Sequence, residues 1–442
     1  MLANISETGQ KRIIIIGGGF GGLKLARELA NSDFQIVLID KNNYHQFQPL
    51  LYQVAMASLD ASNISFPLRD IFKNSSNVRI RVATVKNIDT HKNVVETTLG
   101  NLNYDYLVIA TGAVTNYFGN AAIEKNTFPM KSTWEALVIR NSLLEHFETA
   151  VSSKLVNVEK LLSIVVVGGG PTGVELSGSL AEMKNDSLPF QYPELDFSKM
   201  EIFLVEGSDK LLGNMRETSS QTALHYLQKM GVNIKLNTFV KQYDGTNVLL
   251  QDGSTIESSL VIWAAGVKGN VPSGIDKNLI SKSNKIKTDI YNRVSGFENV
   301  FAVGDIALIE SEKFPRGYPQ LAAVAIDQAK NVAHNFILLA QNKPLKPYSF
   351  FNKGTMATIG RNKAVVDLSK PTWSFKGFFA WLIWMMVHLF LLIEFKNRLV
   401  VFINWLYNYF TRRQSLSLLF EQIEKQQTPN IETRIEQKKE IA

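Results

Sequence analysis

The sequence of 442 residues contains no cysteine. This absence excludes disulfides, zinc sites with thiolate ligands, iron–sulfur clusters and any redox mechanism that uses a pair of cysteines, and we expect no metal site. Apolar runs fall short of the ~20 residues that span a bilayer. We expect no signal peptide, because the first apolar run, at residues 13–16, is short and typical of a strand. No basic stretch interleaved with aromatic residues is present, so no nucleic acid is expected as a partner.

The composition is that of a globular protein with a large core. Hydrophobic residues make up 45% of the chain, which is ordinary for globular proteins, and the length predicts two to three domains. The net charge of +7 is modestly basic. Such a balance is compatible with an anionic membrane face.

The N-terminal part of the chain is organised around a glycine-rich turn. The apolar run at residues 13–16 leads directly into this turn, and a helical pattern follows. The positions of a G-x-G-x-x-G fingerprint are occupied by Gly17, Gly19 and Gly22. The first glycine allows a tight turn, the second admits a pyrophosphate, and the third lets the helix pack on the strand. The next predicted strand ends in Asp40, where a carboxylate can bond a ribose hydroxyl, so the segment predicts a dinucleotide-binding unit.

The same pattern returns in the middle of the chain. A second apolar strand precedes a fingerprint formed by Gly168, Gly170 and Gly173. The following strand ends in Glu206, at a longer offset than usual, which we attribute to a proline-containing loop over residues 185–199. A carboxylate at this place bonds the adenosine ribose 2′-hydroxyl and repels a 2′-phosphate. The sequence therefore favours NADH over NADPH.

Two dinucleotide sites in one chain suggest two bound dinucleotides that exchange electrons. Two nicotinamides have no obvious joint redox use, whereas a hydride passes from nicotinamide to flavin. Later strands end in small residues at 110–113, 263–266 and 302–305, where the backbone can approach a ligand. Asp305 can bond a cofactor hydroxyl or cap a helix. His45, by itself, is more typical of a surface loop.

These features resemble the two-dinucleotide-binding-domain flavoproteins and, more narrowly, type II NADH dehydrogenase, the single-chain, non-pumping NADH:quinone oxidoreductase. The narrow resemblance is carried by residues 43–55, 168–175, 263–267, 301–305 and 353–361, and by the aromatic stretch that follows. It implies an α/β fold class with two Rossmann-like dinucleotide-binding domains plus a C-terminal membrane-associating helical region. The implied domains are the first part of the FAD-binding domain (1–118), the NADH-binding domain (119–270), the second part of the FAD-binding domain (271–350) and the membrane-anchoring region (351–442).

The resemblance also implies roles for individual residues. FAD is expected in the first unit, held non-covalently, and NADH in the second, with a quinone as the final acceptor of two electrons and two protons. Glu175 matches a family carboxylate beside the nicotinamide and the flavin, and we expect it to be catalytic; otherwise it is a first-turn acid favoured by the helix dipole. The expected cofactor-binding residues are Gly17, Gly19, Phe20, Gly21, Gly22, Asp40, Gln48, Thr111, Gly112, Gly304, Asp305, Gly168, Gly170, Pro171, Thr172, Gly173, Glu206, Ala265 and Gly266.

The helix expected at the quinone entrance departs from the family. The family usually carries an A-Q-x-A-x-Q pattern there, whereas Ala323 and Asp327 stand where the two glutamines usually are. We expect Gln320 to lie at the start of this helix. It is the best remaining amide for a quinone carbonyl, and we therefore expect it to be a catalytic residue. The predicted quinone site is Gln320, Ala323 and Lys353. Asp327 can equally be a solvated helix residue.

The aromatic tail predicts two membrane-associating helices, over residues 378–393 and 397–411. Trp381, Trp384 and His388 share one face at helical spacing, as at a lipid interface. We expect monotopic, peripheral attachment to the cytoplasmic face of the cell membrane, with a membrane quinone and the membrane lipid surface as partners. A homodimer through this region is possible. A short transmembrane hairpin, or a buried or dimer-forming core helix, is the alternative.

Two other functions fit the same fingerprints. One is a soluble-type FAD/NAD(P)H reductase of a protein acceptor, such as a ferredoxin reductase, and the other is an NADH-sensing flavoprotein that signals through a partner. Sulfide:quinone reductases and disulfide reductases use cysteines, so the composition argues against both. The tail favours the quinone enzyme, because a soluble reductase need not reach a membrane. Beyond it, residues 414–442 are polar and charged, and we expect their end to be mobile.

Overall fold

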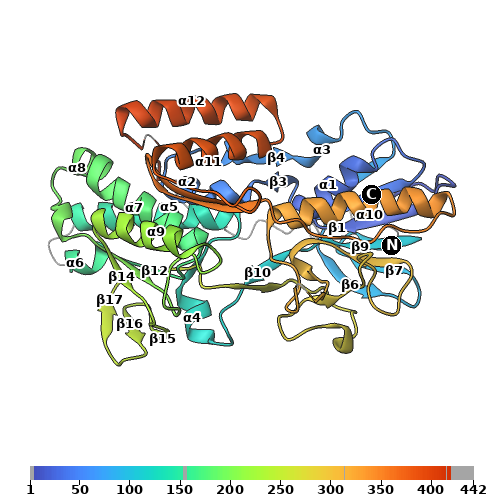
Figure 1. Cartoon of the computed structure of the whole chain (residues 1–442), viewed down its shortest axis with the longest axis horizontal. Helices are drawn as coiled ribbons and strands as arrows, with labels where there is room; N and C mark the ends of the chain where they lie inside the picture. The colour runs from blue at the N-terminus through green and yellow to red at the C-terminus, as the bar shows by residue number, and fades with distance from the viewer. Residues whose placement is uncertain (1–3, 153–156, 313, 415, 420–442) are drawn as a thin grey trace, which may run out of the picture.

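Two parallel sheets form two lobes of an elongated molecule (Figure 1). The structure is a computed structural model that describes residues 4–152, 157–312, 314–414 and 416–419. Most of the C-terminal segment that we expect to be mobile lies outside the described residues. The parallel sheets and their covering helices confirm the predicted α/β fold class.

The first sheet is parallel and is buried on both faces, which is why its strands are nearly continuous runs of isoleucine, leucine and valine. In order across the sheet the strands are β21 (Val300–Ala302), β9 (Tyr106–Ile109), β1 (Arg12–Ile16), β2 (Gln35–Asp40) and β5 (Val78–Val82). One face is covered by α1 (Phe20–Glu28) and α10 (Ala322–Ala340). The other is covered by β6 (Val85–Asp89), β7 (Val94–Thr97) and β8 (Gly100–Asn103). Because β21 and α10 come late in the chain, this lobe is built from two separate segments.

The second sheet repeats this plan. Its strands, in order, are β11 (Phe128–Pro129), β18 (Leu260–Trp263), β12 (Ser163–Val167), β13 (Glu201–Val205) and β14 (Val232–Lys235). Helices α5 (Thr133–Ser152), α7 (Pro171–Glu182) and α9 (Glu217–Lys229) pack on one face. Strands β15 (Val240–Tyr243), β16 (Asn247–Leu250) and β17 (Thr255–Glu257) pack on the other.

The segment between α7 and β13 differs from the expected loop over residues 185–199. It is mostly helical, because α7 continues through a π-helical turn (Met183–Ser187) into α8 (Leu188–Gln191), and a short 3₁₀ turn (Phe197–Lys199) precedes β13. Leu188 and Phe197 are buried in the core of this lobe. The longer spacing between the second fingerprint and Glu206 therefore comes from helical segments that pack in the core.

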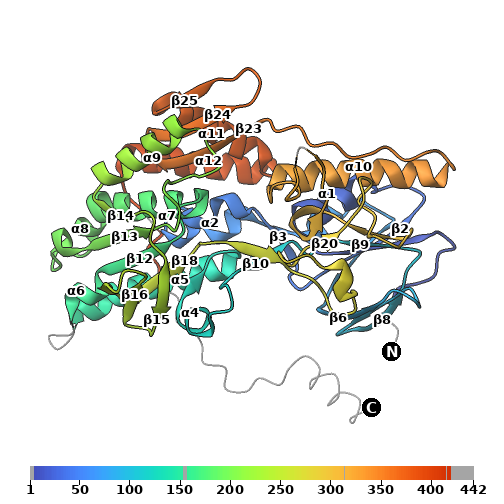
Figure 2. The same cartoon turned by 60° about the horizontal axis from the view of Figure 1, so that its bottom comes forward.

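A pair of antiparallel strands, β10 (Ala113–Thr115) and β19 (Val267–Gly269), joins the two lobes (Figure 2). These strands follow β9 and β18, so both connections leave from the carboxyl edges of the two parallel sheets. The shorter elements are α2 (Leu51–Ala55), α3 (Leu68–Ile71), α4 (Ala121–Asn126), α6 (Val158–Leu161), β3 (Tyr44–Gln46), β4 (Ser65–Pro67), β20 (Ile286–Lys287) and β22 (Ala307–Leu308).

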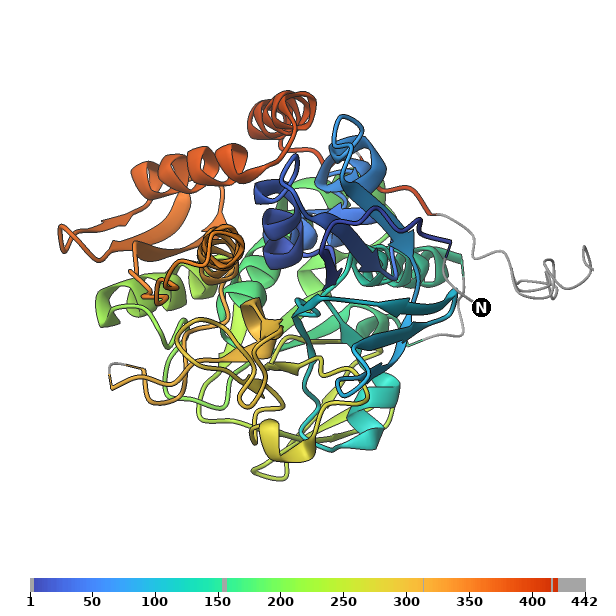
Figure 3. The same ribbon diagram turned by 90° about the vertical axis from the view of Figure 1, so that its right-hand side faces the viewer.

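The C-terminal part forms an antiparallel sheet and two helices on the outside of the lobes (Figure 3). Its elements are β23 (Gly354–Gly360), β24 (Lys363–Leu368), β25 (Ser374–Lys376), α11 (Phe378–Leu391) and α12 (Phe395–Thr411). Strand β23 packs directly on α7, where a side chain at Gly178 would collide with the backbone of Ile359. This close contact couples the second lobe to the C-terminal helices.

Two expectations about local placement were wrong. Helix α10 begins at Ala322, so Gln320 precedes the helix. Trp384 and His388 face the protein interior and are buried, because Trp384 packs against Trp405 and Tyr52. In the described part of the chain, no helix is both long enough and apolar enough to cross a membrane.

Candidate functional site

The first glycine turn leaves open space beside the start of α1. Gly17 has a φ of +108°, and a side chain there would collide with the backbone of Ala110. A side chain at Gly22 would collide with the carbonyl of Gly17, so the helix and the strand need this glycine to pack. By contrast, no atom lies within 4 Å of a Cβ placed on Gly19, which begins the helix without a side-chain cap. Uncapped N–H groups facing open space suit a pyrophosphate.

Asp40 ties the end of β2 to this turn. Its Oδ2 accepts a hydrogen bond of 2.6 Å from the N–H of Gly18, and its Oδ1 accepts one of 2.7 Å from the N–H of Asn42. Burial raises the pKa of Asp40, and these two hydrogen bonds oppose the rise. A carboxylate has about four acceptor sites, so a ribose hydroxyl can still bind there.

The second turn has the same geometry. Gly168 has a φ of +112°, and no atom lies within 4 Å of a Cβ placed on Gly170. Oε2 of Glu206 accepts a hydrogen bond of 2.5 Å from the N–H of Gly169. Its Oε1 accepts hydrogen bonds from the N–H and the hydroxyl of Ser208, at 2.7 and 2.6 Å. One acceptor site therefore remains on Oε2 for a ribose hydroxyl.

The other predicted residues of the second lobe lie along the same edge of its sheet. Pro171 and Thr172 are exposed at the start of α7, next to the glycine turn. Ala265 and Gly266 follow β18, which is hydrogen-bonded to β12, the strand that leads into the turn. The carboxyl ends of parallel strands are where α/β proteins bind ligands. The open turns, the uncapped helices and the strand-end acids fit two dinucleotides.

The corresponding edge of the first sheet brings together residues that are far apart in the sequence. The hydroxyl of Thr111 donates to the carbonyl of Asn270 at 2.6 Å, and the space beside Gly112 is open. The N–H of Gly304 donates to Oε1 of the buried Gln328 on α10, at 2.7 Å. This contact fixes the turn after β21 against α10.

Asp305 follows β21 in the first lobe, close enough to two lysines for their charges to affect its carboxyl group. Burial raises the pKa of Asp305, while the charges of Lys131 and Lys285 lower it. The amide of Gln48 donates to the carbonyl of Lys131 at 3.1 Å, and the amide of Gln320 donates to the carbonyl of Asp305, also at 3.1 Å. The structure therefore groups Gln48, Gln320 and Asp305, which come from three distant segments.

Glu175 is the most strongly perturbed acid of the predicted site. Burial raises its pKa to about 8. Its carboxylate accepts a hydrogen bond of 3.4 Å from the N–H of Thr358 on β23, and this contact and the nearby indole of Trp384 partly offset the rise in its pKa. The side chain of Tyr52 lines the same cavity, and burial, followed by the charge of Glu175, raises the pKa of its phenol. Such a carboxyl group can hold a proton near neutral pH.

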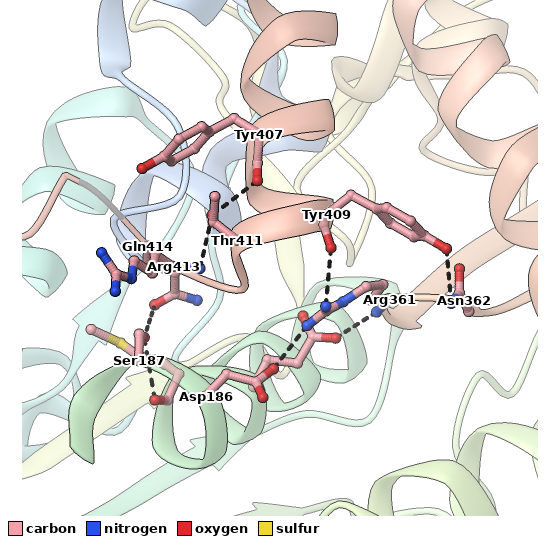
Figure 4. A network of polar contacts seen from close by, with 11 residues as sticks. Asp186, Ser187, Arg361, Asn362, Tyr407, Tyr409, Thr411, Arg413 and Gln414 are labelled. Carbon is pink, nitrogen blue, oxygen red and sulfur yellow. Dashed lines mark hydrogen bonds and ion pairs between the residues drawn. The ribbon is translucent and has the colours of Figure 1, made fainter. Parts of the chain in front are cut away.

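Glu175 lines a cavity of about 120 Å³ between α7, β23 and the two C-terminal helices. Arg361 is one of the residues that line this cavity, and Figure 4 shows its polar contacts. The guanidinium of Arg361 forms an ion pair of 2.9 Å with Asp186 and donates to the carbonyl of Tyr409 at 3.2 Å. The N–H of Arg361 also donates to the half-buried carboxylate of Glu182, at 2.5 Å. Arg361 thus joins the end of α7 to α12.

The three predicted quinone residues are less tightly grouped. Ala323 is exposed on the first turn of α10, and Gln320 lies just before that turn. Lys353 is exposed just before β23 and is not among the residues that line the Glu175 cavity. Asp327 is half-buried on α10, and burial, followed by the charge of Asp327, raises the pKa of Tyr348.

The expectation that His45 is a surface loop residue was wrong. Its side chain is buried, because β3 pairs with β4 and turns the ring inward. Its Nδ1 donates to the carbonyl of Gly18 at 2.9 Å, and its ring meets Phe20 edge-on at 5.2 Å. Burial lowers the pKa of His45 to about 4, so it is neutral and supports the first glycine turn.

A second buried histidine, His388, was expected at a lipid interface. Its Nδ1 donates to the carbonyl of Trp384 at 2.7 Å, its ring stacks on that indole at 4.0 Å, and Phe47 meets it edge-on. Burial lowers its pKa to about 4. The sequence contains one indication that His388 is buried, since it is a single polar residue within an otherwise apolar run.

The chain matches two family models. The description "Pyridine nucleotide-disulphide oxidoreductase" covers residues 11–329, and the "NDH2 C-terminal domain" covers residues 352–414. The chain is 36% identical to the type II NADH:quinone oxidoreductase Ndh of Mycobacterium tuberculosis, over 98% of this chain and 94% of that protein. The chain belongs to the type II NADH:quinone oxidoreductase family.

Other relatives agree with this membership. The type II NADH:quinone oxidoreductase of Haemophilus influenzae is 30% identical, over 81% of this chain and 87% of that protein. The structure of NDH2 from Plasmodium falciparum in complex with NADH has the same fold, with a TM-score of 0.84 over 92% of this chain and 99% of that chain, at 22% identity. The broad family name refers to disulphides, yet this type II member has no cysteine and cannot use a dithiol.

Proposed function

We infer that this chain is a membrane-associated flavoenzyme that transfers two electrons from NADH through FAD to a membrane quinone without pumping protons. Family membership supports the reaction. The observation that carries it in the structure is the pair of glycine turns, each with an uncapped helix start facing open space and an acid at the end of the next strand. Two such turns in one chain provide for two dinucleotides.

We propose the following assignment of the two sites. The turn at Gly17 and Gly19, with Asp40, holds FAD, and the turn at Gly168 and Gly170 holds NADH. Bound FAD supplies a group that accepts a hydride and can pass two electrons on to a quinone. The proposed domain limits are those of the sequence analysis: 1–118, 119–270, 271–350 and 351–442.

Glu175 is the proposed proton-holding residue. The overall reaction, NADH + H⁺ + quinone → NAD⁺ + quinol, consumes one proton from the solvent. A carboxyl group in this cavity whose pKa is raised to about 8 is protonated near neutral pH and can release a proton inside the protein. Gln320 and two residues that come after it in the chain, Ala323 and Lys353, remain the proposed quinone contacts.

We propose that α11 and α12 attach the enzyme to the cytoplasmic face of the cell membrane. Both helices carry large apolar side chains on their outer surfaces, where a contiguous apolar patch marks an interaction site. These exposed residues are Phe378, Phe379, Leu382, Met386, Phe390, Leu391, Phe395, Leu399, Phe402, Ile403, Leu406, Tyr407 and Phe410. Basic side chains at Lys376, Lys396 and Arg398 suit anionic head groups.

The membrane proposal is best tested with surface substitutions. Removal of the chain after Lys370 would also delete Trp384 and so uncover the buried Tyr52 against which it packs, and release of a truncated protein would therefore be ambiguous. We expect combined Phe379→Ser, Phe390→Ser and Phe410→Ser substitutions to abolish sedimentation with liposomes. The exposed Phe239 directly precedes β15, which lies on the opposite side of the molecule from both helices (Figure 1), so Phe239→Ser should leave sedimentation unchanged. If the triple variant instead keeps binding liposomes and changes a homodimer into a monomer, the apolar face joins two copies.

The reaction itself is tested with the purified yellow protein. We expect rapid oxidation of NADH only after addition of a quinone analogue. NADH oxidation that requires oxidised ferredoxin as the electron acceptor, with none on addition of quinone, would favour the reductase of a protein acceptor. Stoichiometric reduction by NADH without turnover on any acceptor would favour an NADH-sensing flavoprotein.

A further inference from the structure

Two exposed phenylalanines stand at the edge of the second sheet where NADH is proposed to bind. Phe118 is 68% exposed and Phe239 is 60% exposed. A single exposed phenylalanine needs no explanation. Each of these rings, however, lies against a glycine that follows a strand of this sheet: Phe118 against Gly266 and Phe239 against Gly207.

The order of the strands places the two rings on opposite sides of the glycine turn. The turn follows β12, which lies between β18 and β13. Gly207 follows Glu206 at the end of β13, whereas Gly266 follows β18. Since Glu206 is the proposed partner of the adenosine ribose, Phe239 lies on the adenine side and Phe118 on the nicotinamide side.

The backbone around Phe118 holds its ring at this edge against a conformational preference. Phe118 has a φ of +52°, a left-handed conformation that is rare for a bulky residue. Its N–H donates to Oδ1 of Asn116 at 2.9 Å. Asn116 is itself tied to the end of β18, because its N–H donates to the carbonyl of Gly266 and its carbonyl accepts from the indole of Trp263. Strained residues of this kind cluster at ligand clamps.

The loop that carries Phe239 is tied to the acid-bearing turn in a similar way. The N–H of Thr238 donates to the carbonyl of Glu206 at 2.9 Å, and the N–H of Asn237 donates to the carbonyl of Ser208 at 2.9 Å. Asn237 has a φ of +51°, which asparagine tolerates. A side chain at Gly207 would collide with the Phe239 ring, so this glycine is what allows the ring to lie over the turn.

We propose that Phe239 and Phe118 clamp the two ends of NADH, with Phe239 stacking on the adenine and Phe118 packing against the nicotinamide half. Aromatic rings recognise a base by its π-face, and stacking of this kind changes affinity by about fivefold to a hundredfold on removal of the ring. The proposal rests on the assignment of NADH to the second turn and adds the two contacts that select a nucleotide with a base at each end.

The test compares two probes on the FAD-containing protein by isothermal titration calorimetry. NAD⁺ has both ends, and ADP-ribose lacks the nicotinamide. We expect Phe239→Ala to lower the affinity for both probes by at least about fivefold. We expect Phe118→Ala to lower the affinity for NAD⁺ to a similar degree. Its affinity for ADP-ribose should stay within about twofold of that of the unmodified protein. Because both rings are largely exposed, these variants should keep their FAD content and melting temperature.

The matched control is Phe190→Ala, which removes an exposed phenylalanine on α8, beyond the opposite end of α7. It should change neither affinity. Phe239→Trp should restore binding of both probes, which a merely structural role would not predict. The clamp is overturned if both alanine variants bind both probes like the unmodified protein. If the unmodified protein binds neither probe, or if Gly170→Val leaves its NAD⁺ affinity unchanged, the assignment of NADH to this turn fails and the clamp fails with it.

Discussion

The indole Nε1 of Trp405 donates a hydrogen bond of 2.7 Å to Oε1 of Gln53, in a buried contact between residues 352 positions apart in the sequence. It joins α12, an outer helix, to α2, a short helix that comes after β3 in the chain. The same glutamine donates its amide to the phenol of Tyr52 at 2.9 Å. The helices proposed to contact the membrane are therefore tied directly to the wall of the Glu175 cavity.

The first prediction concerns this contact. Trp405→Phe keeps an aromatic ring but leaves the buried Oε1 of Gln53 without its donor. An unsatisfied buried acceptor costs about 1–3 kcal/mol, and we expect a lower melting temperature for the FAD-containing protein. Trp373→Phe changes an exposed indole of the C-terminal part and should have little effect. Equal melting temperatures for all three proteins would show that the contact does not contribute to stability.

The second prediction concerns the choice of nucleotide. With both oxygens of Glu206 already facing N–H and O–H donors of the turn, its charge is held at the edge of the sheet. A 2′-phosphate there meets this charge, and we expect kcat/KM for NADH to exceed that for NADPH by at least about tenfold, or ~1.4 kcal/mol. Glu206→Gln should reduce the difference in kcat/KM between NADH and NADPH. Equal use of NADH and NADPH by the unmodified protein would remove the proposed role of Glu206.

The third prediction concerns which turn holds the flavin. A valine at Gly19 would fill the open space where the pyrophosphate is expected, and the Gly19→Val protein should purify without colour. Gly170→Val fills the matching space in the second lobe and should keep its flavin while losing affinity for NAD⁺. Absorbance spectra and calorimetry measure both properties. The opposite pattern, with flavin lost only from Gly170→Val, would mean that the two sites are assigned the wrong way round.

The fourth prediction concerns pH. Burial raises the pKa of Glu175 from 4.5 to about 8. Between these values the native protein keeps a proton that the unfolded chain releases, so the stabilising contribution is complete below about pH 4.5 and is lost as the pH rises through 8. We therefore expect the urea midpoint to fall between pH 5 and pH 8.5, and to fall less for Glu175→Gln. The control is Glu201→Gln, which changes an exposed residue and should behave like the unmodified protein. If the urea midpoint of Glu175→Gln falls with pH as steeply as that of the unmodified protein, Glu175 is not the group that holds this proton.

The fifth prediction concerns Gln320. Its amide donates one N–H to the carbonyl of Asp305 and has a second N–H for a quinone carbonyl. We expect Gln320→Ala to slow the reoxidation of reduced flavin by a quinone a few-fold to tenfold, since a neutral hydrogen bond contributes about 0.5–1.5 kcal/mol. Stopped-flow measurement should show flavin reduction by NADH unchanged. Slower flavin reduction with normal quinol formation would place Gln320 on the nicotinamide side.

Much of the nucleotide-binding frame was readable from short segments. Gly17, Gly22 and Asp40 sit where a strand–turn–helix unit requires them, and the structure gives each the expected geometry. The start of α10 was misplaced by two residues, because Gln320 was taken as part of the apolar helical pattern. Its contact with Asp305 depends on how β21 returns to the first sheet, which no local pattern shows.

Residue types at close spacing were enough to predict the two glycine turns, the acids that follow them, the absence of dithiol chemistry and the aromatic tail. The side of α11 that faces the protein, by contrast, depends on packing between distant segments. Both sides of that helix are apolar, so periodicity could not distinguish a lipid-facing ring from a core ring. Trp384 and His388 are buried because α12 and Tyr52 cover them, whereas Phe379 and Phe390 on the same helix remain exposed. A hydrophobic pattern identifies the residues that avoid water, and the packing of distant segments decides what covers them.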